Sequence, residues 1–200
     1  MYLIGLTGNI ACGKSTVVAM LRELGAAVCD ADAVTHLVQA PGAPAHAAIV
    51  AAFGPAVLRE PGDAASPIDR PALGRIVFGD PAALRRLEEI IHPAVRAWIW
   101  AWLDERRADG SAVAVIDAIK LLESGWPAAC DAVWVVTAAP EQQLARLMGE
   151  RGMSGADARQ RIAAQNPQAD KVAAADVVID NSGTLDETRA QVLAAWRNLP

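Results

Sequence analysis

The most distinctive chemistry of the sequence lies in the segment Gly8-Asn9-Ile10-Ala11-Cys12-Gly13-Lys14-Ser15, which matches the phosphate-binding pattern G-x-x-x-x-G-K-[ST]. In such a loop the glycines let backbone N–H groups point inward at phosphate oxygens, and the following helix presents its positive end to the same anion. Lys14 is expected to neutralise the β- and γ-phosphates, and the Ser15 hydroxyl to ligate Mg²⁺. The pattern predicts a nucleotide site that extends from Gly8 to Thr16.

A second candidate for chemistry is the acidic pair Asp30 and Asp32, which follows a short apolar segment expected to be a strand at residues 27–29. Ligands of parallel α/β sheets bind at the carboxyl ends of strands. A carboxylate there can accept the proton of an acceptor hydroxyl during phosphoryl transfer. Either aspartate can instead cap the next helix, so the residues alone leave the choice open.

Composition excludes several other classes of protein. The net charge of −5 lacks the broad basic field of a general nucleic-acid binder. No Asn-Lys-x-Asp motif for guanine and no ABC-type signature is present. No apolar run reaches the length of a membrane helix. The scattered cysteines fit neither a disulfide framework nor a zinc site, which favours a cytoplasmic location; they are Cys12, Cys29 and Cys130.

The elements that must position these residues alternate between strand and helix, which predicts an α/β fold with a P-loop three-layer core and a five-stranded parallel sheet. The expected strands are 2–7, 27–29, 112–116, 132–137 and 177–179. The stretch between the second and third strands is too long for a simple crossover. We therefore expect a core of residues 1–32 and 112–200, an inserted helical domain at about 33–111, and a small glycine-flanked lid at about 146–160.

Helix boundaries are indicated by capping residues. Asp69 is expected to cap one helix, and Asp80-Pro81 to open the next, which Pro93 should bend or restart. The segment Thr184-Leu-Asp-Glu187 is a capping box for the last helix. That helix is expected to place three apolar side chains inward, namely Leu185, Val192 and Trp196.

The sequence resembles the dephospho-CoA kinase family along nearly its whole length. The resemblance is carried by the phosphate loop with Asp30-Ala31-Asp32, and by motifs that recur in the family's order. These are Pro41-Gly42-Ala43-Pro44, Ile68-Asp69-Arg70-Pro71-Ala72-Leu73-Gly74-Arg75-Ile76-Val77-Phe78, Leu87-Glu88-Glu89-Ile90-Ile91-His92-Pro93, Gln143 to Met148, Arg161 to Gln165, and Asp180-Asn181-Ser182-Gly183.

The resemblance implies a kinase that uses ATP and Mg²⁺ to phosphorylate the ribose 3′-hydroxyl of dephospho-CoA, which completes coenzyme A. It implies a helical acceptor domain and a lid, small-molecule partners with no nucleic acid or membrane, and a monomer or weak homo-oligomer. By the same resemblance Asp32 is the general base, Arg146 lies over the phosphates, and Asn181 contacts the adenine. The acceptor side is represented by Arg70, His92 and Asp117, where Asp117 is a candidate acid for Mg²⁺ or the acceptor.

Two segments depart from the family's pattern. Asp117-Ala118-Ile119-Lys120 has isoleucine in place of the usual proline and lysine in place of an apolar residue, so we hypothesise that Lys120 contacts an acceptor phosphate. In the lid the arginine of Glu150-Arg151-Gly152 is shifted by one position, which leaves open whether Arg146, Arg151, Arg159 or Arg161 reaches ATP. Two other functions remain as alternatives: another small-molecule P-loop kinase, for nucleosides or sugars, and a nucleotide-binding regulator without transfer activity.

Overall fold

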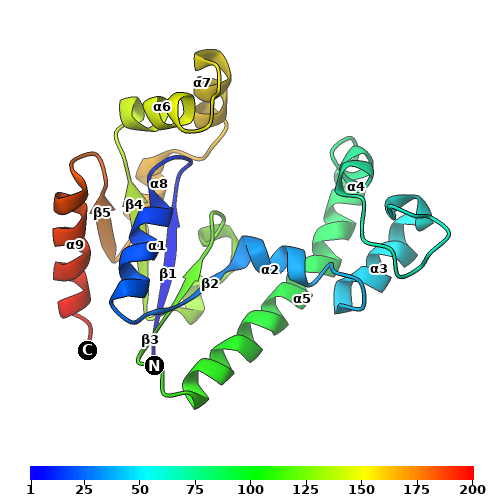
Figure 1. Cartoon of the computed structure of the whole chain (residues 1–200), viewed down its shortest axis with the longest axis horizontal. Helices are drawn as coiled ribbons and strands as arrows, with labels where there is room; N and C mark the ends of the chain where they lie inside the picture. The colour runs from blue at the N-terminus through cyan, green and yellow to red at the C-terminus, as the bar shows by residue number, and fades with distance from the viewer. The chain divides into compact units, whose positions relative to one another are not determined.

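The computed structural model describes residues 1–200, and the chain divides into two units (Figure 1). One unit consists of Met1–Cys29 and Arg106–Pro200, and the other of Asp30–Glu105. The domain boundaries expected from the sequence lie a few residues later along the chain at both junctions. The functional roles of these parts, as nucleotide-binding core, acceptor domain and lid, stay a prediction.

The first unit is built on a five-stranded sheet in the order β2-β3-β1-β4-β5. The strand β1 pairs in parallel with β3 and β4, and β4 pairs in parallel with β5, which confirms the α/β fold. β1, β3 and β4 are buried almost throughout, as expected of a sheet covered on both faces. The strands are β1 Tyr2–Gly8, β2 Ala27–Asp30, β3 Val113–Asp117, β4 Ala132–Thr137 and β5 Val177–Asp180.

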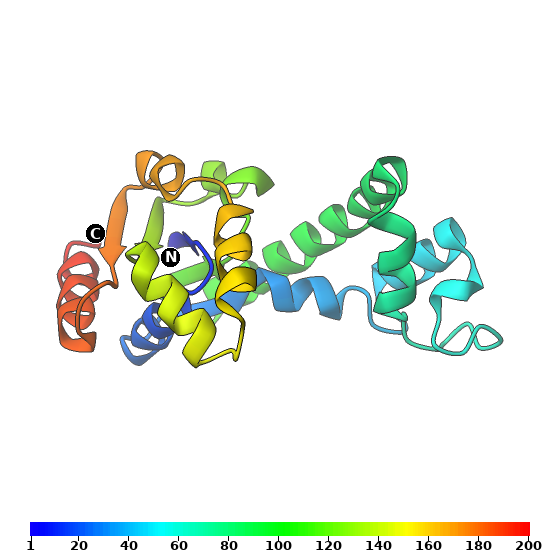
Figure 2. The same cartoon turned by 90° about the horizontal axis from the view of Figure 1, so that it is seen from above.

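Helices cover both faces of this sheet (Figure 2). α1 (Lys14–Glu23) and α9 (Leu185–Arg197) lie on one face and α8 (Gln168–Ala173) on the other. α8 was not foreseen, because a six-residue helix carries too little periodicity to be recognised in an alanine-rich sequence. α6 (Pro140–Gly149) and α7 (Gly155–Ala163) pack against each other above the end of β1 (Figure 1). Short 3₁₀ turns, η2 (Leu122–Ser124) and η3 (Pro127–Ala129), follow β3.

The capping box predicted for the last helix is confirmed, with the Thr184 side chain accepting from Glu187 N–H and the Glu187 carboxylate accepting from Thr184 N–H. Val192 is fully buried and Trp196 is half-buried against the core. The inward position expected for Leu185 is wrong, because its side chain is 56% exposed. Leu185 is the first residue of α9 and lies at the rim of a pocket, where no strand covers it.

The second unit is helical and contains α2 (Ala31–Leu37), α3 (Pro44–Phe53), the 3₁₀ turn η1 (Pro55–Val57), α4 (Arg70–Val77) and most of α5 (Pro81–Ala108). Asp69 caps α4 as predicted, since its carboxylate accepts from Ala72 N–H at 3.1 Å. The restart expected at Pro93 is wrong, because α5 continues unbroken through it for 28 residues. A proline removes one hydrogen bond from a helix, and a long amphipathic helix retains enough others to tolerate that loss. None of the helices is both long and apolar enough to cross a membrane.

Candidate active site

The phosphate loop joins the buried strand β1 to α1 in a conformation that its residue types explain. Ala11 and Gly13 have positive φ angles of 55° and 86°, so the chain curls tightly before α1 begins at Lys14. Gly8 has no room for a side chain, since a Cβ atom there would lie 2.6 Å from both Cys12 Sγ and Val136 O. The loop is therefore packed against β4 from below and leaves its upper side free for a ligand.

A pocket of about 600 Å³ opens above this loop, within the first unit. The whole segment Gly8–Thr16 lines it, together with residues of α6 and α7 and residues that follow β3 and β5. Three arginines contribute to the lining, namely Arg146, Arg151 and Arg161, whereas Arg159 instead donates to Gly155 O at 3.3 Å. Lys14 and these three arginines thus place positive charge around this cavity in a chain that is acidic as a whole.

Lys14 forms an ion pair with Asp117 in the structure. The pairing of Leu6 with Asp117 in the sheet places this carboxylate at the end of β3, next to the strand that leads into the loop. Both side chains are largely shielded from water, with exposures of 18% for Lys14 and 10% for Asp117. The Asp117 carboxylate thus holds the Lys14 amine at the end of β3, next to the loop.

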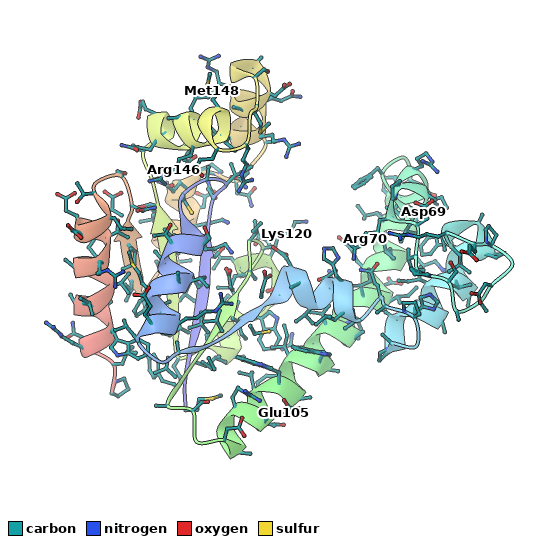
Figure 3. All side chains as sticks on the ribbon, in the orientation of Figure 1. Asp69, Arg70, Glu105, Lys120, Arg146 and Met148 are labelled. Carbon is teal, nitrogen blue, oxygen red and sulfur yellow. The ribbon has the colours of Figure 1, made fainter.

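The side chains of Arg146 and Asn181 donate hydrogen bonds to backbone carbonyls of the phosphate loop. Arg146 on α6 donates to Ala11 O at 3.1 Å and to Asn181 O at 2.8 Å (Figure 3). The buried Asn181 donates through Nδ2 to Cys12 O at 2.8 Å and accepts from the Thr188 hydroxyl at 2.8 Å. The Asn181 side chain is thus occupied as a support of the loop, while the residue also lines the pocket.

Two polar residues that no sequence pattern indicated also contact this site. Gln165 Oε1 accepts from Ile10 N–H of the loop at 2.7 Å. Lys171 is buried, and its Nζ donates to Ile119 O at 2.9 Å and contacts the Thr7 hydroxyl at 3.4 Å. Burial lowers the pKa of Lys171, against a smaller opposing influence of Glu123. No local pattern signals this lysine, because Thr7 lies 164 positions away in the sequence.

Cys12 lies inside the loop but is 1% exposed and packs into the core of the first unit. Burial raises the pKa of its thiol, and the nearby Lys14 only partly opposes this effect. A buried thiol with a raised pKa is a poor nucleophile. Cys12 therefore serves as a small core residue, and the loop contributes its backbone rather than this side chain to the site.

The structure shows which aspartate of the acidic pair after β2 caps the next helix. Asp30 caps α2, because its Oδ1 accepts from Ala33 N–H at 3.0 Å. Asp32 lies in the first turn of α2, is exposed and has no hydrogen-bond or ion-pair partner. Asp30 is therefore the capping residue, and the catalytic role expected of Asp32 stays a prediction.

The residues expected on the acceptor side belong to both units. Arg70, at the start of α4, places Nη1 3.3 Å from His36 Nε2 on α2, within the helical unit. His92 is exposed on α5. Lys120 is exposed in the loop after β3 and does not line the pocket above the phosphate loop (Figure 3). The structure contains no cluster of three His, Cys, Asp or Glu side chains that could hold a metal by itself.

A parallel α/β sheet whose first strand runs into a lysine-bearing phosphate loop defines a P-loop nucleotide-binding protein. The family model for dephospho-CoA kinase matches residues 2–187. The chain belongs to the dephospho-CoA kinase family. It therefore transfers a phosphoryl group from ATP to dephospho-CoA, the final step of coenzyme A biosynthesis.

Individual relatives agree with this assignment. The chain is 54% identical to a dephospho-CoA kinase of Symbiobacterium thermophilum over 98% of this chain and 81% of the relative. A crystal structure of a Thermus thermophilus protein is 33% identical, with a TM-score of 0.83 over 98% of this chain and 96% of that one. The structure of dephospho-CoA kinase from Campylobacter jejuni is 27% identical, with a TM-score of 0.71 over 98% and 95% of the two chains.

Proposed function

We propose that the pocket of the first unit binds ATP together with Mg²⁺, and that Asp32 accepts the proton of the ribose 3′-hydroxyl of dephospho-CoA. The observation that carries the proposal is the pocket of about 600 Å³, lined by the complete phosphate loop and three arginines. Such a lining matches a triphosphate in both charge and hydrogen-bonding capacity.

The residues around the loop suggest how the triphosphate is held. Its oxygens replace Gln165 as the acceptor of the Ile10 N–H hydrogen bond and replace Asp117 as the partner of Lys14. Lys14 and the loop amides then stabilise the charge that develops on the γ-phosphoryl group during transfer. Arg146, already fixed on the loop through Ala11, adds positive charge from the lid side. Asn181 contributes by fixing Cys12, and the adenine contact expected of it stays a prediction.

The residues present fit a magnesium ion. Ser15 is exposed at the start of α1 and lines the pocket, and Asp117 supplies a carboxylate near Lys14. Hydroxyl and carboxylate oxygens are the hard donors that Mg²⁺ prefers, and nucleotide-bound Mg²⁺ takes its other ligands from phosphates and water. When bound, the ion offsets negative charge on the β- and γ-phosphates.

We further propose that residues 30–105 bind the acceptor and that residues 146–160 act as a lid. In this scheme Arg70 and His92 belong to the acceptor-binding surface, with Asp117 as a further acid and Lys120 as a contact to an acceptor phosphate. The enzyme is proposed to act in the cytoplasm as a monomer or weak homo-oligomer on small molecules, without nucleic-acid or membrane partners.

The test of the base compares Asp32→Asn with Asp30→Asn. Asparagine caps helices as well as aspartate does, so Asp30→Asn should leave turnover close to wild type. Loss of a general base should lower kcat by about 10²- to 10⁴-fold in Asp32→Asn while the Kd for ATP changes little. The measurement is ADP release coupled to dephospho-CoA, with mass analysis of the product. Near-normal turnover of Asp32→Asn would remove Asp32 as the base.

The proposed role of Lys120 has a separate test. Lys120→Ala should raise the KM for dephospho-CoA and leave the KM for ATP unchanged. An unchanged KM for dephospho-CoA would show that Lys120 is only a solvated surface residue, as its exposure also allows.

A further inference from the structure

We infer that a second pocket, wholly inside the helical unit, binds the 5′-diphosphate of dephospho-CoA. This inference rests on the proposed acceptor-binding role of that unit. The pocket has a volume of about 600 Å³ and is lined by the end of α2, the segment after it, Arg59 and the start of α4. Its cationic or potentially cationic lining residues are His36, Arg59 and Arg70, and Asp69 is the one carboxylate among its lining residues.

No carboxylate forms an ion pair with either arginine of this pocket, although Asp69 contributes one negative charge to the lining. Arg70 donates to His36 and to no carboxylate, and the Arg59 side chain has no hydrogen-bond or ion-pair partner. Asp69 is committed to capping α4 through Ala72 N–H. Two guanidinium groups without acidic partners at one cavity form a site for an anion with several oxygens, such as a diphosphate.

The contact between Arg70 and His36 places the Arg70 guanidinium where it can donate hydrogen bonds to a ligand oxygen. A guanidinium group only donates, so the contact of 3.3 Å between Arg70 Nη1 and His36 Nε2 is a hydrogen bond in the tautomer whose Nε2 accepts. An arriving phosphate oxygen can replace His36 as the acceptor of the Arg70 proton. The contact of Arg70 with His36 is long and involves no carboxylate, so a charged ligand can displace it.

The spacing along α2 identifies the anion as part of the acceptor. Asp32 and His36 are separated by four residues on this helix, so they lie on the same face about 6 Å apart along its axis. In dephospho-CoA one ribose ring carries both the reacting 3′-hydroxyl and the 5′-oxygen that leads to the diphosphate. A ribose bound with its 3′-hydroxyl at Asp32 can therefore direct its diphosphate toward His36 and Arg70.

The walls of the pocket fit the part of the same substrate that is attached beyond the diphosphate. The pantetheine arm begins with an aliphatic carbon that bears two methyl groups. Apart from the cationic residues, Asp69 and Gln39, the lining is apolar and consists of Ala40, Pro41, Pro67, Ile68 and Pro71. The pocket thus joins a charged part to an apolar part, as does this region of dephospho-CoA.

The experiment measures binding of dephospho-CoA by calorimetry to the full-length wild type and to Arg70→Ala and Arg59→Ala. Loss of a charged hydrogen bond should raise the Kd for dephospho-CoA by about 10- to 100-fold in Arg70→Ala and less in Arg59→Ala, with the Kd for ATP unchanged. The ³¹P resonances of bound dephospho-CoA should shift in both variants. Arg75→Ala is the matched control, because Arg75 is exposed on the same helix and does not line the pocket.

The possible results distinguish failure of the diphosphate site from failure of the proposed acceptor-binding role of the helical unit. Wild-type affinity and unshifted ³¹P resonances in Arg70→Ala and Arg59→Ala would overturn the diphosphate site while leaving the kinase assignment intact. An equal loss of ATP and dephospho-CoA binding would show a merely structural effect and also overturn it. Wild-type protein that fails to bind dephospho-CoA at all would instead refute the proposed acceptor role of the helical unit. Arg59 lies on an exposed segment, so Arg59→Ala remains informative if Arg70→Ala unfolds.

Discussion

Replacing Asn181 by alanine tests whether this residue is mainly a support of the phosphate loop. In the structure its Nδ2 group donates to Cys12 O at 2.8 Å, in a buried environment between β5 and the loop. The substitution leaves the Cys12 carbonyl without this donor. The Thr188 hydroxyl also loses a partner, but it keeps a bond of 3.2 Å to Thr184 O. The main loss is therefore that of one buried hydrogen bond to the loop.

The size of the effect can be worked out from these contacts. A buried carbonyl left unsatisfied costs about 1–3 kcal/mol, and the small void left by the amide brings the expected loss of unfolding free energy to about 2–3 kcal/mol. For a chain of this length, such a loss lowers Tm by about 4–12 °C. Since the loop would no longer be held in its binding conformation, the KM for ATP should rise about tenfold, with the KM for dephospho-CoA nearly unchanged.

The assay combines urea unfolding with steady-state kinetics, and Asn198→Ala at the exposed end of α9 serves as the control. If Asn181→Ala raises the KM for ATP but its unfolding free energy stays within about 0.5 kcal/mol of the wild type, the reasoning is refuted. Asn181 would then act as a direct nucleotide ligand, as the family resemblance implies, and the loop would not depend on it.

Three further predictions concern the elements around the site. Gly8→Ala should lower the unfolding free energy by about 1–3 kcal/mol in urea because its Cβ would collide with Val136 O, while Gly149→Ala, where no atom lies within 4 Å, should be neutral or stabilising. Thr184→Ala should lower Tm through a loss of about 1 kcal/mol of capping. Because the hydrogen bonds from Thr184 lower the pKa of Glu187, the difference in unfolding free energy between wild type and variant should shrink as pH falls below about 4.5. A difference that stays constant with pH would contradict this prediction. Burial lowers the pKa of Lys171, so the lysine of the unfolded chain keeps its proton to higher pH than that of the folded chain. The wild type should therefore gain stability relative to Lys171→Met as pH rises toward 10.5. Parallel pH profiles of the unfolding free energy would show that Lys171 does not titrate in this way.

Features decided by neighbours in the chain were predictable from the sequence. The loop pattern from Gly8 to Ser15, the cap at Asp69 and the capping box at Thr184 each depend on contacts within a few residues. The five strands were found for the same reason, because short apolar runs between turn residues are local signals. Local signals failed where a helix was too short, as in α8, or where a long helix outweighed one unfavourable residue, as at Pro93.

The sequence by itself determined that this chain has a phosphate loop and carboxylates after its strands, and only the tertiary structure decided which of them meet. Lys14 and Asp117 lie 103 positions apart, and Asn181 and Cys12 lie 169 apart. They come together because the order β2-β3-β1-β4-β5 puts the ends of β3 and β4 on either side of the loop and β5 next to β4. Strand order is set by the packing of whole faces of the sheet, so no pattern of neighbouring residues encodes it.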